Sequence, residues 1–219
     1  MSISAADVKA LRERTGAGIM DCKTALAETG GDLAKAIEYL QIKGIAKAAK
    51  KAGRVASDGL VHAYIHTGGR VGVLLEVNCE TDFVAKTDGF RSLVNDIALH
   101  IAAMSPQFIR PEDIDEGTRA KQFELFKAQG VESGKPAQIV AEKIVPGRMS
   151  KWAAEICLLS QPFVKDPDKT VADLVREATA AIGEKIDVRR FTRYEVGEGM
   201  EKRADDFAAE VAAAAGAGA

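Results

Sequence analysis

Apolar residues recur at helical spacing through the first part of the chain and are interrupted twice by glycine. The residues on these apolar faces are Val8 and Leu11, then Ile19, Cys22 and Leu26, then Leu33, Ile37 and Leu40. Residues 16–18 (Gly-Ala-Gly) and the glycine pair at 30–31 separate the three sets, and the third set stops near Gly44. Because glycine ends helices and faces of this period pack together, the pattern predicts a compact bundle of three short helices.

Polar residues stand where helix N-termini need caps. Ser4 is followed three residues later by Asp7, and Thr170 by Asp173, which is the spacing of a capping box. Asp32 precedes the third apolar set and can cap its helix. These residues predict helices that begin after Ser4, Asp32 and Thr170.

The middle of the chain begins with an alternating pattern that is typical of strands. Residues 60–66 and 71–79 are rich in β-branched residues, and the glycines at 68 and 69 supply the positive φ values of a primed hairpin turn. One face of the second segment carries Val71, Val73, Leu75, Val77 and Cys79. In a third segment, residues 186–196, one face carries Ile186, Val188, Tyr194 and Val196. We expect an antiparallel sheet that is exposed on one face.

Helical periodicity returns between and after these strands. A single apolar stripe runs from Phe90 to Met104. Further helical patterns on either side of residue 132 predict a projecting helical hairpin over about residues 112–158. Its second helix is expected to be interrupted at Pro146 and Gly147, because proline lacks a backbone donor and clashes with the preceding turn.

Together these patterns predict an α+β protein in three parts. Residues 1–54 form a three-helix domain that resembles the ubiquitin-associated fold and ends in a basic linker. Residues 55–199 form a core in which a small antiparallel sheet packs with helices and the helical hairpin. Residues 200–219 are an alanine-rich C-terminal helical module, which we expect to dock by Phe207 and Val211.

The end of the first part is basic. Lys43, Lys47, Lys50, Lys51 and Arg54 stand among alanines. Such a run is either a phosphate-binding patch or a solvated helical linker. No aromatic residue is interleaved with the cations, so the pattern favours the linker.

The composition narrows the class of protein. Of 219 residues, 47% are hydrophobic and 28% are charged, which excludes a disordered chain. The formal net charge of −2 and an aromatic content of 5% argue against nucleic acid and an anionic membrane as partners. No apolar run approaches the ~20 residues of a membrane span, and no signal-peptide pattern is present. With three cysteines, an odd number that fits free thiols, we expect a cytoplasmic protein.

Catalytic chemistry has little support in the sequence. No glycine-rich turn followed by Lys-Ser or Lys-Thr stands between a strand and a helix, so neither common phosphate loop is present. Cys79 has the acidic neighbours Glu80 and Asp82, which raise a thiol pKa and oppose its use as a nucleophile. No histidine is placed by sequence to serve it. We expect no catalytic residue, no metal site and no cofactor.

The segment at the end of the second strand is unusual, because it carries apolar residues in a polar neighbourhood. Residues 78–86 read NCETDFVAK, with Phe83 and Val84 near the entrance of a helix. In one interpretation Phe83 is a hydrophobic staple that packs back on the core. In the other it is an exposed wedge presented to a partner. The residues alone favour the staple.

Five segments together resemble the family of translation elongation factor Ts, the nucleotide-exchange factor for elongation factor Tu. Residues 8–23 (VKALRERTGAGIMDCK) are similar to the first family signature and residues 75–85 (LEVNCETDFVA) to the second. Similarity to later family segments is carried by residues 161–164 (QPFV), 193–199 (RYEVGEG) and 206–211 (DFAAEV). The resemblance covers essentially the whole chain.

The resemblance implies an exchange factor rather than an enzyme. Such a factor binds elongation factor Tu and speeds the release of GDP, so that GTP can reload. The family segment that matches Thr81, Asp82, Phe83 and Val84 intrudes near the partner's nucleotide site and dislodges its magnesium ion. The resemblance further implies contacts with this partner at Arg12, Ile19, Met20, His100, Phe207 and Val211.

Two features depart from the longer members of the family. Those members carry two related core halves, whereas this chain has one hairpin, in residues 60–79. It resembles a short form, and the resemblance implies a homodimer or a two-to-two complex with the partner. Pro146 stands where a residue that continues the helix is expected. Two other functions stay open from the residues: a binding module whose head recruits another partner, and a thiol enzyme that uses Cys79.

Overall fold

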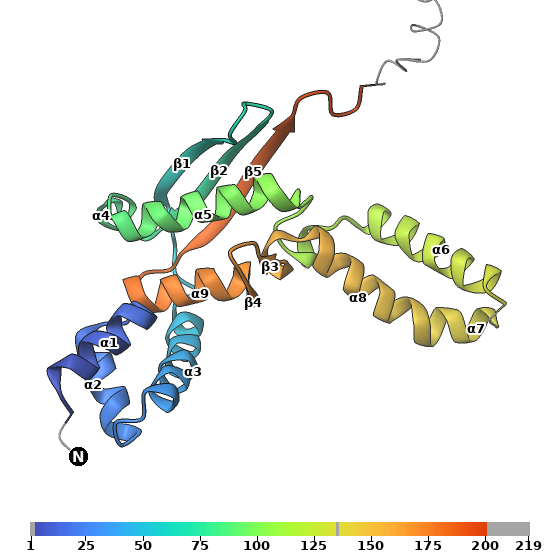
Figure 1. Cartoon of the computed structure of the whole chain (residues 1–219). Coiled ribbons are helices and arrows are strands. Elements are labelled where there is room, and N and C mark those ends of the chain that lie inside the picture. Colours follow the sequence, from blue (N-terminus) through green and yellow to red (C-terminus); the bar gives the residue numbers. More distant parts are fainter. Residues whose placement is uncertain (1–2, 135, 201–219) are drawn as a thin grey trace, which may run out of the picture.

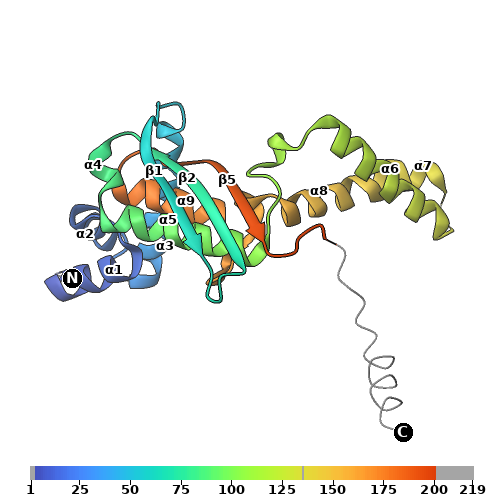
Figure 2. The same cartoon turned by 90° about the horizontal axis from the view of Figure 1, so that it is seen from above.

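The computed structural model describes residues 3–134 and 136–200. A three-helix head lies at one end, a sheet and its helices lie in the middle, and a helical hairpin projects at the other end (Figure 1). The view from above has the same order, with the head and the hairpin far apart (Figure 2). The predicted α+β class is confirmed. Within the described ranges, no helix has both the length and the apolar character needed to cross a bilayer.

The head consists of α1 (Ala5–Thr15), α2 (Ile19–Glu28) and α3 (Leu33–Lys51). Ser4 and Asp7 form the predicted capping box of α1, and the Asp32 carboxylate accepts an N–H in the first turn of α3. The bundle buries Leu11, Cys22, Ala25, Leu26 and Ala36. Local caps and one apolar face per helix therefore produce the bundle that the sequence predicts.

Helix α3 is longer than predicted, because it continues past Gly44 to Lys51. A Cβ on Gly44 would lie 3.2 Å from the Cβ of Ala180 on α9 (Val171–Ile182). Glycine therefore permits a close contact between two helices here and does not end α3. The predicted stop was wrong, because packing against α9 outweighs the ~1 kcal/mol that glycine costs inside a helix.

The basic run at the end of α3 is tied to neighbouring elements. Lys47 Nζ lies 2.8 Å from a carboxylate oxygen of α2. Lys51 donates to the carbonyl of Gly183, and Arg54 lies 3.2 Å from the Glu80 carboxylate. The linker interpretation was therefore incomplete, since this segment joins the head to the core.

A three-stranded antiparallel sheet has the order β1 (Asp58–Ile65), β2 (Val71–Cys79), β5 (Asp187–Glu195). Gly68 and Gly69 in the hairpin turn have φ values of 90° and 69°, as a primed turn requires. The predicted apolar face of β2 is confirmed by the burial of Val73, Leu75, Val77 and Cys79.

The faces of β5 differ from the prediction in its second half. The pairing skips one residue of β5 opposite the step from Glu76 to Val77, which is a β-bulge. Beyond a bulge the alternation changes phase, so Val188 is buried whereas Tyr194 is 72% exposed. The prediction that Tyr194 and Val196 share the face of Val188 was therefore wrong.

Helix α5 (Asp88–Met104) packs on one face of the sheet, and α9 packs against α5 and α3 (Figure 1). The Thr87 hydroxyl caps α5 by accepting the N–H of Phe90. The helix buries the predicted stripe as far as Ile101, and Met104, the last residue of that stripe, is exposed. The other face of the sheet carries the exposed side chains of Val61, Ile65, Leu74 and Tyr194.

Short elements connect these parts. They are α4 (Asp82–Ala85), η1 (Pro111–Asp113), η3 (Leu158–Ser160), β3 (Pro162–Phe163) and β4 (Asp166–Thr170). β3 and β4 pair with each other as a separate two-stranded sheet. Thr170 and Asp173 form the predicted capping box of α9.

The projecting hairpin pairs α6 (Glu116–Glu132) with an arm made of α7 (Ala137–Ile139), η2 (Val140–Ile144) and α8 (Val145–Ile156). This arm stays helical through Pro146 and Gly147, so the predicted interruption was wrong. Pro146 has no N–H to donate, and η2 is a π turn that accommodates this loss. In that turn the Val145 N–H donates to the carbonyl of Val140, five residues earlier.

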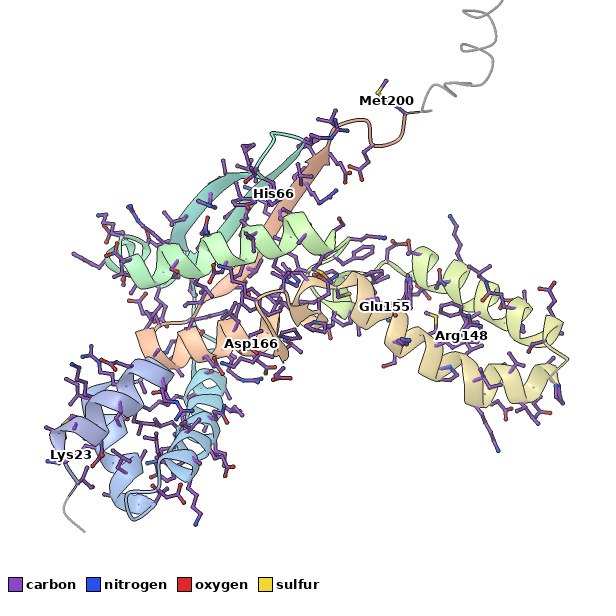
Figure 3. The ribbon with its side chains drawn as sticks, viewed as in Figure 1. Lys23, His66, Arg148, Glu155, Asp166 and Met200 are labelled. Carbon is purple, nitrogen blue, oxygen red and sulfur yellow. The ribbon has the colours of Figure 1, made fainter. Side chains whose placement is uncertain are left out.

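The two arms of the hairpin interlock at one level. Gly130 of α6 faces Val140, and a Cβ on Gly130 would lie 3.1 Å from Val140 Cγ2 and closer still to Cγ1. Arg148 lies between the arms (Figure 3), with its guanidinium 4.2 Å from the centre of the Phe126 ring. It also donates to Gln129 at 2.6 Å. Glycine, π turn and arginine together define the register of the hairpin.

Candidate functional site

The short helix α4 follows β2 almost directly and divides its apolar residues between core and solvent. Val84 packs against the core and Ala85 is buried. The Phe83 side chain extends into solvent, with 78% of its surface exposed. Helix α4 lies at the same end of the molecule as the head in both views (Figures 1 and 2). An anchored turn thus presents one large apolar side chain, a feature that marks interaction sites when other apolar residues lie near it.

The staple interpretation of Phe83 was wrong. A staple would bury the ring against the core, yet Phe83 is among the most exposed large apolar residues in the described part of the chain. Val84, one residue later, makes the contact with the core that the staple hypothesis gave to Phe83. The ring instead has the ammonium of Lys86 at 6.0 Å from its centre.

The polar residues around α4 have partners within the chain. Asp82 forms an ion pair with Lys86 at 2.6 Å, and this contact holds the pKa of Asp82 below its ordinary value. Both side chains are more than half exposed, so the pair is weak and an incoming partner can displace it. Thr81 is the N-cap of α4, yet its hydroxyl does not bond to the helix. It donates instead to Glu184 at 2.7 Å.

The head presents the other predicted contact residues. Ile19 and Met20 begin α2 and are 56% and 71% exposed. Arg12, on α1, is also exposed. The head and α4 therefore offer exposed apolar side chains at one end of the molecule (Figure 2). The predicted contact residues Phe207 and Val211 lie outside the described residues, as does the predicted C-terminal module beyond Met200.

His100 differs from the expectation, because its side chain is completely buried on α5. The Val164 N–H donates to Nδ1 at 3.2 Å, so the ring proton is on Nε2, which donates to Gln161 Oε1 at 2.9 Å. Gln161 Nε2 in turn donates to the carbonyl of Glu155 in α8 at 2.6 Å. Burial lowers the pKa of His100 below 6.5. In this structure His100 offers no atom to a partner and instead joins α5 to the base of the hairpin.

The three cysteines are all buried, at positions 22, 79 and 157. Burial raises the pKa of the Cys79 thiol, and the Glu184 carboxylate adds to this shift. The predicted direction was right, but the acid responsible is remote in sequence rather than Glu80 or Asp82. Among the residues described, no cluster of three or more His, Cys, Asp or Glu side chains could hold a metal ion.

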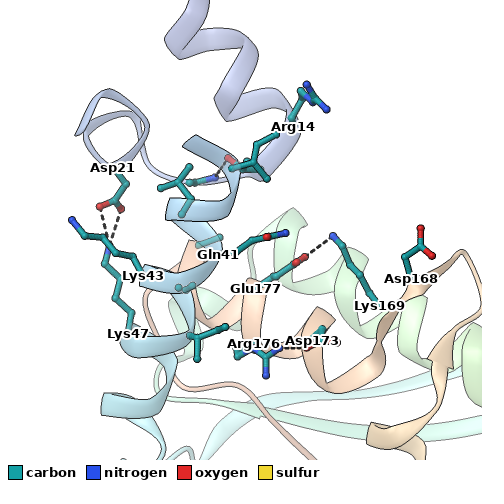
Figure 4. Close-up of a pocket in the computed structure, with 18 residues that line it drawn as sticks. Arg14, Asp21, Gln41, Lys43, Lys47, Asp168, Lys169, Asp173, Arg176 and Glu177 are labelled. Atoms are coloured by element: carbon teal, nitrogen blue, oxygen red, sulfur yellow. Dashed lines mark hydrogen bonds and ion pairs between the residues drawn. The ribbon is translucent and has the colours of Figure 1, made fainter. Parts of the chain in front are cut away.

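A cleft of about 370 Å³ lies between the head and α9 (Figure 4). Its walls carry charges of both signs that pair with each other, such as Lys169 with Glu177 at 2.9 Å and Arg176 with Asp173. This cleft has no signal in the sequence, because its two walls are far apart along the chain. Paired charges favour no single class of ligand, so we interpret the cleft as the joint between head and core.

Sequence reasoning also missed Glu184. Its carboxylate accepts the backbone N–H of Thr81, although the two residues are 103 positions apart. No motif marks this contact, because it depends on the pairing of β2 with β5 that brings the two segments together.

The chain is similar to curated proteins along nearly its whole length. The family model described as "Elongation factor TS" matches residues 4–198. An alignment of 211 residues with "Elongation factor Ts" of Desulforamulus reducens shows 62% identity and covers 96% of this chain and 97% of that protein. The protein of the same name from Geotalea daltonii is 58% identical over 217 residues, covering 99% of this chain and 100% of that protein. That from Moorella thermoacetica is 63% identical over 198 residues, covering 90% and 97%.

Proposed function

Because this chain belongs to the elongation factor Ts family, we propose that it is a guanine-nucleotide exchange factor for translation elongation factor Tu. It binds the GDP-bound partner, speeds the release of GDP and holds the nucleotide-free state until GTP enters. This role uses no catalytic residue of the factor and no nucleic acid or membrane partner. It places the chain in the cytoplasm, where protein synthesis takes place.

The exposed ring of Phe83 on an anchored turn is the observation that carries the proposed mechanism. In a GTPase, the bound Mg²⁺ and the phosphate loop neutralise the phosphates of the nucleotide. A rigid apolar side chain that enters beside these elements and shifts them weakens nucleotide binding without covalent chemistry. In this mechanism Thr81, Asp82, Phe83 and Val84 form the wedge, and loss of the magnesium ion follows its entry.

The energy available from the ring corresponds to a large change in the rate of release. Burying a phenylalanine side chain in a partner is worth roughly 1.5–3 kcal/mol. If that energy is realised only while nucleotide is leaving, it lowers the release barrier, and each ~1.4 kcal/mol is about tenfold in rate. Because the two binding equilibria are linked, bound nucleotide must weaken the binding of the exchange factor to the same extent as the exchange factor weakens the binding of nucleotide.

Other contacts supply affinity in this proposal. Arg12, Ile19 and Met20 bind the partner from the head, and Phe207 and Val211 remain predicted contacts. We also propose a homodimer, in a two-to-two complex with the partner, that pairs the uncovered sheet faces about a two-fold axis. This proposal is supported by the exposed apolar side chains on that face, which are Val61, Ile65, Leu74 and Tyr194.

The proposed function is tested by stopped-flow release of fluorescent GDP from elongation factor Tu. The chain should accelerate release, and the acceleration should shrink when a chelator has already removed the magnesium ion. Binding without acceleration would instead support the alternative of a plain binding module. Loss of acceleration on replacing Cys79 alone, in a folded variant, would support the thiol enzyme.

A further inference from the structure

Two glutamates cross between the end of β2 and the chain that leads into β5. The β2–β5 ladder stops at the pair Asn78 and Asp187. Beyond that point, Glu184 Oε2 accepts the N–H of Glu80 at 3.1 Å and the N–H of Thr81 at 3.0 Å. The other oxygen, Oε1, accepts the Thr81 hydroxyl at 2.7 Å. One carboxylate thus continues the pairing of the two segments after the backbone ladder has ended.

Glu80 makes the reciprocal contact. Its Oε1 accepts the N–H of Lys185 at 2.6 Å, and its carboxylate pairs with Arg54 at 3.2 Å. Two contacts hold the pKa of Glu80 below its ordinary value: the larger effect comes from the Lys185 N–H and the smaller from the Arg54 guanidinium. Lys185 Nζ also donates to the carbonyl of Arg54 at 2.9 Å. The residues just after α3, the start of the wedge and the chain before β5 are therefore held together by one cluster of hydrogen bonds.

This cluster of hydrogen bonds ends at Thr81, two residues before Phe83. In most helices an N-cap threonine hydroxyl bonds to the first turn of its own helix. The Thr81 hydroxyl is directed to Glu184 instead, so the start of α4 is fixed by a side chain from another segment. A wedge is effective only when it is held in its working position before the partner arrives. A free loop would instead lose conformational entropy on binding and reduce the effect of the ring.

We propose that Glu184 is a positioning residue for nucleotide exchange, which acts through Phe83 by fixing the backbone at Glu80 and Thr81. This inference rests on the proposed function, since it assumes that Phe83 acts on the partner. Glu184 itself touches neither the partner nor the nucleotide.

A first test uses the free protein and does not depend on the partner. In Glu184→Ala, the amide protons of Glu80 and Thr81 should exchange with solvent about tenfold faster or more, as followed by NMR. The matched control is Asp173→Ala, because Asp173 also accepts a threonine hydroxyl and that residue's N–H, at Thr170. The control should leave exchange at Glu80 and Thr81 unchanged. Equal protection of these two amides in wild type and Glu184→Ala would overturn the proposal.

A second test is a double-mutant cycle on the release of fluorescent GDP at saturating factor. Glu184→Ala should slow stimulated release about tenfold, equivalent to ~1.4 kcal/mol, and Asp173→Ala should not. In a Phe83→Ala background the same Glu184→Ala change should have no further effect, because its target is already absent. An equal slowing in both backgrounds would overturn the proposal, because Glu184 would then act independently of the ring.

Glu184→Gln keeps the test decisive if Glu184→Ala does not fold. The amide retains one acceptor oxygen, and neutral hydrogen bonds are about half as strong as charged ones, so release should slow only about threefold. Release at the wild-type rate by folded Glu184→Gln, with unchanged exchange at Thr81, would overturn the proposal. Failure of the proposed function looks different, because the wild-type chain itself would then not accelerate GDP release.

Discussion

Replacing His100 tests whether this residue supports the fold or contacts the partner. His100→Ala leaves Gln161 Oε1 buried without its donor, which costs about 1–3 kcal/mol, and removes the bond from the Val164 N–H, worth about 0.5–1.5 kcal/mol. The ring also leaves a cavity. We expect the free energy of unfolding to fall by about 3 kcal/mol. His100→Asn should lower the free energy of unfolding by about half as much, because its amide oxygen can accept the Val164 N–H.

Urea denaturation measures this loss, with the fluorescence of the single tryptophan, Trp152 in α8, as the probe beside the base of the hairpin. His66→Ala, which removes an exposed histidine, is the matched control and should change stability by less than about 0.5 kcal/mol. Folded His100→Asn should still stimulate GDP release from elongation factor Tu. A His100→Ala variant that unfolds at the wild-type urea concentration but no longer stimulates release would show instead that His100 contacts the partner directly.

The buried, neutral state of His100 should also make the free energy of unfolding depend on pH. Burial holds the pKa of His100 below 6.5, so the unfolded chain binds more protons than the folded chain as the pH falls from that value. The stability due to the neutral ring is therefore full above about pH 6.5 and is lost as the pH falls toward the folded pKa. His100→Asn should remove this part of the slope.

Three further predictions concern other parts of the molecule. Gly130→Ala should destabilise the hairpin by about 1–3 kcal/mol, because the new Cβ meets Val140. Gly147→Ala has open space around it and should stabilise α8 by about 0.5–1 kcal/mol. Thermal unfolding of the two variants measures both changes. Stimulated exchange should survive replacement of all three cysteines, and a folded Cys79→Ala variant that no longer stimulates GDP release would contradict this. Size exclusion with light scattering should give a dimer mass at micromolar concentrations, and a monomer mass would contradict the proposed pairing of sheet faces.

Local signals in the sequence were sufficient for most elements. The capping boxes at Ser4 and Thr170, and the turn glycines at 68 and 69, depend on neighbours in the chain and appear as predicted. The errors arose where distant residues decide the outcome. Gly44 lies inside α3 because it faces Ala180 on another helix, and Tyr194 changed face because of a bulge opposite β2.

The candidate site was predicted in part for the same reason. The resemblance located Thr81 to Val84, but the spacing of Phe83 and Val84 allows either residue to pack on the core, so the direction of the ring could not be predicted. The structure buries His100, whose surroundings come from residues more than 60 positions away. Glu184 has no local signal, because its contacts exist only when β2 and β5 pair.

The wedge mechanism is tested most directly by the rate of GDP release from elongation factor Tu with saturating wild-type factor and with saturating Phe83→Ala. The Phe83→Ala variant should have wild-type circular dichroism and thermal stability, because the ring is 78% exposed in the free protein. Release with this variant should be slower by about one to two orders of magnitude, from the roughly 1.5–3 kcal/mol of ring burial. A folded Phe83→Ala variant that stimulates GDP release at the wild-type rate would contradict the wedge mechanism.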